Sequence, residues 1–191
     1  MGCESQAQHQ GSSEVGEHLR GLTLVFLRGL AGVQKQTHVA FSLALASTAA
    51  VLLSYTVYEY VVAIVAAIVS SVLPDLDLYF RHRMALHNVN VFLVLALTAY
   101  TILSPFGHTE PVIVGLAAGY LGHILLDMFT VRGVAFMYPL TSRRLRLARL
   151  RSSSTVANTA ITVASLLIFA YSSLSIAVRL VTMLETLLPT P

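Results

Sequence analysis

The chain alternates between long apolar stretches and short polar ones. Five apolar segments each approach the roughly 20 residues that a helix needs to cross a bilayer. The predicted spans are residues 38–57, 59–73, 86–104, 111–129 and 156–178, of which the second is short and ends at Pro74. A membrane barrel would alternate apolar and polar positions instead. The pattern therefore predicts an all-α fold, a polytopic membrane helix bundle with about five transmembrane helices.

The first 36 residues differ from the rest of the chain. Residues 1–20 are polar and rich in Gly, Ser and Gln, a composition typical of a disordered tail. Residues 21–34 are apolar but short, and Arg28 interrupts them, which favours an interfacial amphipathic helix over a span. The expected organisation is a tail with an interfacial helix (1–36), a four-helix membrane domain (37–140), a basic loop (141–155), and a fifth helix with a C-terminal tail (156–191).

Composition excludes an ordinary soluble domain. The 191 residues are 55% hydrophobic and 11% charged, whereas about a quarter of the residues of a soluble domain are charged. Cys3 is the only cysteine, which excludes an intrachain disulfide and a cysteine-based zinc site. The net charge of +3 does not indicate a nucleic-acid partner, because the basic residues lie between apolar segments, where they set membrane orientation.

The basic residues predict that orientation. With five spans, eleven of the twelve Lys and Arg residues fall on one side of the membrane. They are Arg20, Arg28, Lys35, Arg81, Arg83, Arg132, Arg143, Arg144, Arg146, Arg149 and Arg151. By the positive-inside rule this side is the cytoplasm, so we expect an integral inner-membrane protein with a cytoplasmic N-terminus and an external C-terminus. The arginine-rich run at 143–151 is explained as a topology anchor that touches anionic headgroups.

Several ionisable residues fall at the same, cytoplasmic ends of the predicted helices. Such groups are costly in a membrane, about 2.5–3.5 kcal/mol at a helix centre, and persist where they pair, meet water or bind an ion. The candidate metal ligands are His38, Asp75, Asp77, His82, His87, His123 and Asp127. Imidazoles and carboxylates without thiolates suit zinc, with manganese or iron as alternatives, and seven groups suffice for two ions. The sequence therefore predicts a divalent metal site.

Each of these residues also has a simpler explanation. His38 could be an interfacial residue, Asp75 and Asp77 could serve only as turn and cap residues, and His82 could belong to a basic loop. His123 and Asp127, four residues apart on one helix face, could form a hydrogen-bonded pair. Two residues on the opposite side, His108 and Glu110, are excluded from the site. It is the gathering of all seven at one face that favours the metal site.

The order and spacing of these residues resemble a known family. The segments "LPDLD" at 73–77, "HRMALH" at 82–87 and "GYLGHILLDMFTVRGVAFMYP" at 119–139, with Thr37-His38, are similar to the YdjM-like family of LexA-regulated, inner-membrane-associated metal-dependent hydrolases. The resemblance covers residues 37–140 and implies that the seven candidates and Arg83 occupy family positions. Leu86 and Asn88 depart from the hydroxyl residues that the family tends to have there.

That family is distantly similar to zinc-dependent phospholipase C and the P1-type nucleases, which implies phosphoester hydrolysis. Asp77 is then a catalytic candidate as general base or partner of a ligating histidine, and Arg83 a phosphate clamp, with a headgroup anchor as its alternative. The interfacial location favours membrane lipids as partners and a phospholipid or polyprenyl phosphate as substrate. The rival functions are a non-catalytic metal-binding scaffold and a metal-ion transporter, whose ion would lie nearer the midplane.

Overall fold

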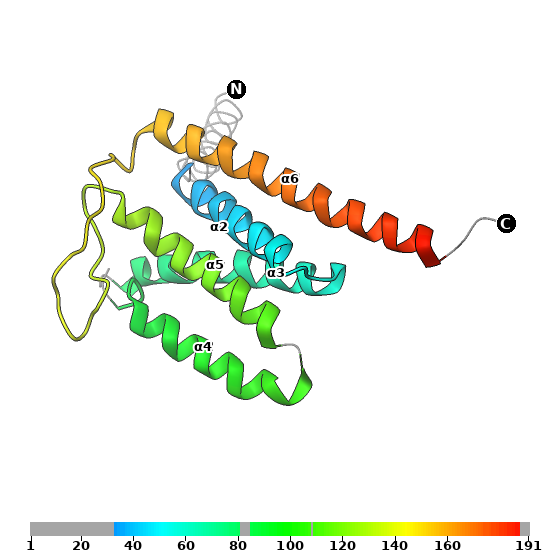
Figure 1. The fold of residues 1–191 in the computed structure, drawn as a ribbon. Helices are drawn as coiled ribbons and strands as arrows, with labels where there is room; N and C mark the ends of the chain where they lie inside the picture. The colour runs from blue at the N-terminus through cyan, green and yellow to red at the C-terminus, as the bar shows by residue number, and fades with distance from the viewer. Residues whose placement is uncertain (1–32, 81–84, 108, 188–191) are drawn as a thin grey trace, which may run out of the picture. The chain divides into compact units, whose positions relative to one another are not determined.

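The computed structural model describes residues 33–80, 85–107 and 109–187, without the side chains of residues 33, 34 and 77–80. The described chain contains five α-helices: α2 (Val33–Leu52), α3 (Val57–Val72), α4 (Val89–Leu103), α5 (Thr109–Met128) and α6 (Thr155–Leu187). Two 3-10 segments follow α3 and α4, namely η1 (Leu73–Phe80) and η2 (Ser104–Phe106). The described residues contain no β-strand, so the predicted all-α bundle is confirmed (Figure 1). The tail of residues 1–20 and most of the predicted interfacial helix lie outside the described residues.

Four helical stretches are long and apolar enough to cross a membrane. They are Val57–Leu76, Val89–Phe106, Thr109–Met128 and Thr155–Leu187. The first predicted span, now α2, is not among them, although its 20 residues would extend about 30 Å. Its polar positions lower its hydropathy, and Thr37, His38, Ser42 and Ser47 are buried against the other helices. α2 is thus a central helix that hides polar side chains, rather than one that presents an apolar surface all round.

The second helix begins earlier and continues further than the sequence predicts. Thr56 and Glu59 form a capping box: the Glu59 amide donates to Thr56 Oγ1, and the Thr56 amide donates to Glu59 Oε2 at 2.8 Å. This cap starts α3 at Val57, so beginning the span at Glu59 was wrong. Pro74 does not stop the helical backbone either, because η1 continues through it with the tighter 3-10 geometry to Phe80.

Two other boundaries also differ from prediction. The Asn88 side chain accepts a hydrogen bond from the Val91 amide at 3.0 Å and caps α4, which therefore starts at Val89 and not at residue 86. α6 ends at Leu187 rather than at residue 178. Its 33 residues extend about 50 Å. The helix is therefore longer than the ~30 Å hydrocarbon core, and it must tilt or extend beyond that core.

Close contact between α3 and α5 depends on glycines. A Cβ atom on Gly119 would collide with Ser70 Oγ and the Ala67 carbonyl oxygen, and one on Gly115 with the Ala63 carbonyl oxygen. Small residues at such positions let membrane helices approach through their backbones. The Ser70 hydroxyl also donates to the Gly115 carbonyl at 3.4 Å. The contact fixes the position of α5 relative to the end of α3.

The buried core forms three groups of side chains. One contains Ala46, Ala67 and Ala118, where α2, α3 and α5 meet through alanines. A second contains Ala50, Tyr55, Ala63 and Ile176 and includes α6, while a third contains Tyr120, Ile124 and Val134 near the C-terminal end of α5. No residue of α4 is buried, which suits an outer helix whose apolar surface meets lipid.

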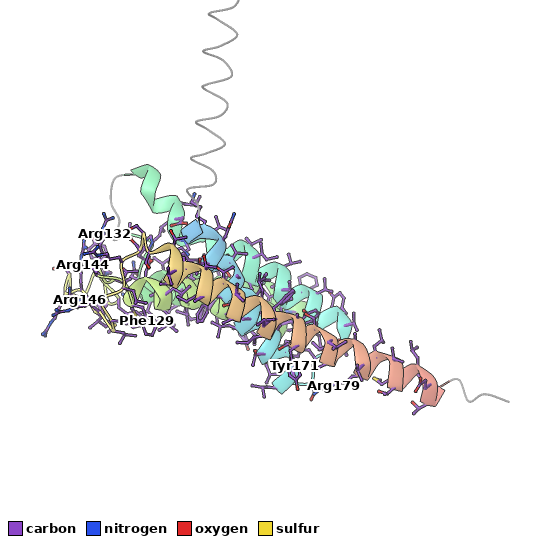
Figure 2. The ribbon with its side chains drawn as sticks, turned by 90° about the horizontal axis from the view of Figure 1, so that it is seen from above. Phe129, Arg132, Arg144, Arg146, Tyr171 and Arg179 are labelled. Carbon is purple, nitrogen blue, oxygen red and sulfur yellow. The ribbon has the colours of Figure 1, made fainter. Side chains whose placement is uncertain are left out.

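The predicted basic loop folds back against the end of α5. Val134 and Leu145 exchange backbone hydrogen bonds at 3.0 and 2.8 Å, and the Leu147 amide donates to the Met128 carbonyl at 2.8 Å. Gly133, at φ 60°, permits this turn, since a Cβ there would meet the Leu145 carbonyl oxygen. The arginines of this loop are exposed, and Figure 2 shows Arg132, Arg144 and Arg146 gathered at one end, away from Arg179.

Candidate metal centre

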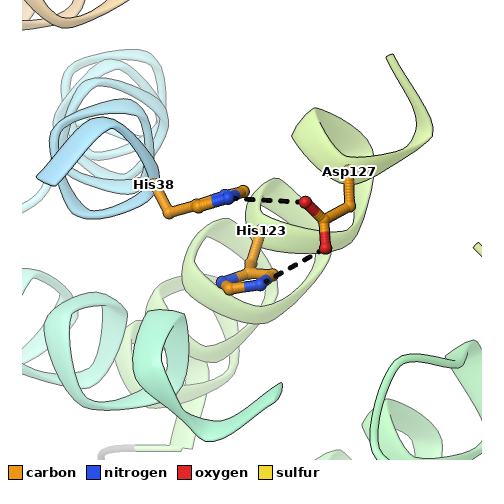
Figure 3. A group of neighbouring side chains, drawn as sticks. All are labelled: His38, His123 and Asp127. Atoms are coloured by element: carbon orange, nitrogen blue, oxygen red, sulfur yellow. Dashed lines mark ion pairs between the residues drawn. The ribbon is translucent and has the colours of Figure 1, made fainter. Parts of the chain in front are cut away.

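Five side chains from four segments of the chain converge at the end of the bundle nearest the arginine-rich loop. His38 comes from the first turns of α2, Asp75 from η1, and His87 from the segment before α4. His123 and Asp127 lie one turn apart near the C-terminal end of α5. Figure 3 shows His38, His123 and Asp127 pointing toward one another. Residues that are far apart in sequence thus form one cluster.

The two carboxylate oxygens of Asp127 face different histidines. Oδ1 lies 3.5 Å from His38 Nε2. Oδ2 lies 3.5 Å from His87 Nε2 and 3.7 Å from His123 Nε2. A direct N–H···O hydrogen bond would be about 2.7–3.2 Å long. Two donor atoms of one tetrahedral zinc ion, with bonds of about 2.1 Å, lie about 3.4 Å apart. The observed spacing of 3.5–3.7 Å is longer than a well-formed hydrogen bond and is close to the separation expected for two ligands of one cation.

The backbone fixes which nitrogen of His123 faces the cluster. His123 Nδ1–H donates to the carbonyl oxygen of Ser71 at 2.7 Å. In the neutral ring this leaves a lone pair on Nε2, which lies 3.7 Å from Asp75 Oδ1 as well as from Asp127. Nε2 is buried and has no hydrogen-bond partner among the described residues. A lone pair that faces two carboxylates is unfavourable unless a cation lies between them.

The three histidine rings pack directly against one another. The His38 and His123 rings stack, with centroids 3.9 Å apart and an interplanar angle of 13°. The His87 ring meets His123 edge-on, with centroids 5.5 Å apart. All three residues are buried, with 7%, 8% and 1% of their surface exposed for His38, His87 and His123 respectively. Because the three rings are buried and packed against one another, their nitrogens are held in position, which favours a metal site that is formed before the ion binds.

Neighbouring groups hold the cluster in position. The Tyr120 hydroxyl, completely buried, donates to the Leu86 carbonyl next to His87. The Val89 amide donates to the Phe136 carbonyl at 2.9 Å, and Asn90 Nδ2 donates to the Tyr138 carbonyl at 2.7 Å. These bonds tie the segment before α4 to α5, and the start of α4 to the loop that follows α5. The position of His87 therefore depends on the contact with Tyr120 before it and on the contacts of Val89 and Asn90 after it.

The ligand atoms form two overlapping groups that could each hold a metal ion. One consists of His38, His123 and Asp127, and the other of Asp75, His87 and His123. His123 belongs to both, yet it offers only Nε2, because Nδ1 is engaged by Ser71. The donor set of neutral imidazoles and carboxylates suits zinc and other divalent transition metals. The Ser71 contact is also typical of metal-binding histidines, which usually donate their second N–H to a carbonyl or carboxylate.

The structure brings together five of the seven predicted ligands. The side chain of Asp77, and the whole of His82 and Arg83, lie outside the described residues, so their predicted roles stay predictions. Glu110, which the sequence excluded, lies near Tyr55, a residue that packs with Ala50 and Ala63 in a separate core group.

Ser71 and Tyr120 were not among the predicted site residues. A backbone carbonyl such as that of Ser71 cannot be recognised from sequence, whereas a tyrosine within an apolar helix is a polar group that can be. Asn88, noted as a departure from the family pattern, caps α4.

Comparison with known proteins gives a family assignment. The family model of the YdjM inner membrane protein matches residues 33–188 of the chain. Searches among curated proteins and among solved structures gave no match. The matched region contains all five described helices and all five residues of the cluster. The chain therefore belongs to the family of the YdjM inner membrane protein.

Proposed function

We propose that the protein is a membrane-bound metal-dependent hydrolase that cleaves a phosphoester at the cytoplasmic leaflet. The observation that carries this proposal is the orientation of His123, whose Nδ1–H is held by the Ser71 carbonyl while Nε2 faces two carboxylates. A proton on Nε2 would find no acceptor at hydrogen-bond distance among the described residues. A divalent cation would satisfy this arrangement, and the family resemblance supplies the reaction type.

The ligand roles follow from the distances. His123 and Asp127 are the principal ligands, because each of the four His–Asp pairs at 3.5–3.7 Å described above includes one of them. His38, Asp75 and His87 complete the set. Because Oδ1 and Oδ2 of Asp127 face different histidines, this carboxylate is suited to serve two ions or to anchor one. Asp77 as general base and Arg83 as phosphate clamp remain part of the proposal from the sequence.

The bound ion would act as a Lewis acid that lowers the pKa of a coordinated water toward ~7 and offsets negative charge on a phosphoryl oxygen. The protein's own contribution is to fix the donor atoms before substrate arrives. The Ser71 carbonyl sets the His123 tautomer, the His38 ring stacks on it, and burial excludes bulk water from the nitrogens. Such pre-organisation reduces the reorganisation that the reaction requires.

Orientation toward the cytoplasm is supported by the charge distribution. The exposed arginines of residues 132–151 lie at the cluster end, whereas Arg179 donates to the Val51 carbonyl at 3.2 Å, at the other end of α2 (Figure 2). By the positive-inside rule the cluster end faces the cytoplasm. A reporter fused to the C-terminus should then read as external. A cytoplasmic reading would overturn the proposed orientation.

Metal analysis combined with hydrolysis assays tests the proposal. The protein purified in detergent should contain a divalent metal and should cleave at least one member of a panel of phospholipids and phosphodiesters. A chelator should remove both properties, and the metal should restore them. The control is Glu110→Gln, which removes a carboxylate at the other end of the bundle and should change neither.

Two outcomes would contradict this proposal. If the wild-type protein contained no metal and bound no added zinc, manganese or iron, the proposed metal centre would be contradicted. A protein that binds metal tightly and hydrolyses no member of the panel would instead fit the scaffold or, if it moves the ion across vesicles, the transporter.

A further inference from the structure

A cavity of about 430 Å³ lies beside the cluster. It is bounded by α2, the C-terminal part of α5, residues 150–152 and the first turns of α6. Its walls are largely apolar, with Phe41, Leu125, Phe129 and Ile161 among the lining residues. Because such cavities usually receive apolar groups with a few polar contacts, its lining suggests the chemistry of its ligand.

The size of the cavity fits one hydrocarbon chain. A dry apolar cavity of about 150 Å³ holds one benzene molecule, so a space almost three times larger has room for one chain on the order of a dozen or more carbons. Phospholipids surround a membrane helix on every side and supply such chains at high local concentration. A diacyl lipid could insert one chain here and leave its second chain in the bilayer.

His38 joins the cavity to the cluster. It lines the cavity and its Nε2 lies 3.5 Å from Asp127. A molecule in the cavity would therefore contact at least one of the candidate metal ligands, His38. The other polar groups at this wall are engaged: the Thr37 hydroxyl contacts Thr162 Oγ1 at 3.0 Å, and Asn158 Nδ2 donates to the Ser152 carbonyl at 2.9 Å. Because these groups already form hydrogen bonds within the protein, recognition of a charged ligand requires another residue.

Arg151 supplies a positive charge at the same cavity. Its side chain is exposed, lines the cavity, and forms no ion pair with any described residue. A guanidinium at the edge of an apolar space is suited to bind phosphate with two parallel hydrogen bonds. An apolar chamber, a cation at its edge, and His38, the one cluster residue among its lining residues, together match an anionic lipid.

We infer that this cavity binds one acyl chain of a membrane phospholipid, whose phosphate is held between Arg151 and the His–Asp cluster. This inference rests on the proposed function, which makes the His–Asp cluster a catalytic metal site. It adds the substrate class and the residues that select it. The acyl chain positions the headgroup, so a soluble phosphodiester binds more weakly than a lipid with the same headgroup.

Tryptophan fluorescence tests the inference without relying on catalysis. The chain contains no Trp, so Phe129→Trp places a single fluorophore in the cavity wall, and Tyr171→Trp places one on the exposed surface of α6 (Figure 2). Phospholipids with brominated acyl chains quench on contact. Quenching of Phe129→Trp should saturate at a low fraction of brominated lipid, whereas quenching of Tyr171→Trp should rise in proportion to that fraction.

Two pairs of variants identify the contacts. Ala157→Phe, in the Phe129→Trp background, fills the cavity and should raise the half-quenching lipid concentration about tenfold, as the loss of a few buried methylenes implies. Ala160→Phe, exposed on the same helix, should not. Arg151→Gln should weaken quenching by brominated phospholipid but not by brominated diacylglycerol, and Arg149→Gln should affect neither. If Ala157→Phe does not fold, Ala157→Leu is the smaller filling substitution.

The outcomes separate this inference from the proposed function. Saturable quenching whose half-quenching concentration Ala157→Phe raises about tenfold or more supports the lipid site, even if the wild-type protein cleaves no phosphoester and the hydrolase proposal fails. Equal quenching in Ala157→Phe and Ala160→Phe would assign the cavity to another occupant and overturn the inference, even if soluble phosphodiesters are hydrolysed. The inference would also be overturned if brominated diacylglycerol gave saturable quenching, unchanged by Arg151→Gln, while brominated phospholipid gave none.

Discussion

The acidic residues at the two ends of the bundle have different environments. At one end, the Tyr55 hydroxyl donates to Glu110 Oε1 at 3.3 Å, and Glu59 closes the capping box with Thr56 at 2.8 Å. At the other end, Asp75 and Asp127 face three buried histidines at 3.5–3.7 Å. Acidic residues at the first end accept hydrogen bonds from Tyr55 and Thr56, while those at the second face buried histidine nitrogens at 3.5–3.7 Å, a spacing that two ligands of one cation would also have.

The difference is consistent with a structural role for the acidic groups at the first end and with the metal site that we propose at the second. Burial, together with the nearby charge of Glu110, raises the pKa of Tyr55 to about 12, so its hydroxyl remains a donor across the physiological range. The hydrogen bond between Tyr55 and Glu110 therefore requires no additional ion or ligand. In the cluster of histidines and aspartates, His123 Nε2 is buried and has no hydrogen-bond partner among the described residues, and the proposed cation would be its partner. The following substitutions test this contrast in order of expected effect.

His123→Ala should have the largest effect on metal binding. It removes the one residue common to both ligand groups, and we expect metal affinity to fall by more than about 100-fold. Metal content after purification, measured by elemental analysis, checks this. Glu110→Gln is the control at the other end of the bundle. Equal metal content in wild type and His123→Ala would show that the two ends do not differ as described.

Gly119→Ala should disturb the cluster indirectly. The new Cβ would meet Ser70 Oγ and the Ala67 carbonyl, so α5 must move away from α3, at a cost of about 1–3 kcal/mol in unfolding free energy. His123, one turn further along α5, then loses its register with Ser71, and metal affinity should fall as well.

Gly122→Ala is the matched control for that substitution. A Cβ there would lie 3.1 Å from Leu45 Cδ1, the end of a flexible side chain that can move. Thermal unfolding in detergent should show a smaller shift for Gly122→Ala than for Gly119→Ala. The opposite order would contradict the dependence of the cluster on the α3–α5 contact.

Tyr120→Phe should weaken metal binding moderately. It removes the hydroxyl that donates to the Leu86 carbonyl and so holds the segment carrying His87. Residues that orient metal ligands are worth about 10–100-fold in affinity, and we expect the lower end of this range. Titration with zinc measures the affinity. An unchanged value would show that His87 is positioned by other contacts or does not bind the metal.

Tyr55→Phe should have the smallest effect and leave metal binding unchanged. It removes one hydrogen bond to Glu110, worth about 1 kcal/mol in unfolding free energy. Thermal unfolding and metal content, measured on the same sample, test both expectations. Loss of metal in Tyr55→Phe would mean that the two ends are coupled, and the contrast between them would no longer hold.

Much of the fold could be predicted because membrane helices need long apolar runs. All five predicted spans correspond to helices of the structure. Their ends were less predictable: the Thr56–Glu59 box and the Asn88 cap moved two starts, and η1 continued past Pro74. Caps depend on single side chains whose partners lie three residues away, and an apolar run does not reveal them. The greater length of α6 arose because residues beyond 178 still favour a helix.

The candidate ligands could also be predicted in part. A histidine or aspartate in an apolar context is costly, so His38, His123 and Asp127 stand out in the sequence, and topology places them at one face. Which nitrogen of His123 faces the cluster could not be predicted, because the Ser71 carbonyl that decides it lies 52 residues away. The cavity shared by α2, α5 and α6 was equally hidden, since its walls come from three separate segments.

The sequence by itself determined a helical membrane protein with polar groups concentrated at one end, because hydropathy and charge placement are local properties of the chain. Only the tertiary structure decided how these groups meet. It buried the polar side of α2, brought α5 against α3 at Gly119, and set the nitrogen–oxygen distances of the cluster at 3.5–3.7 Å. Distances between side chains depend on how helices pack, and packing depends on many residues at once.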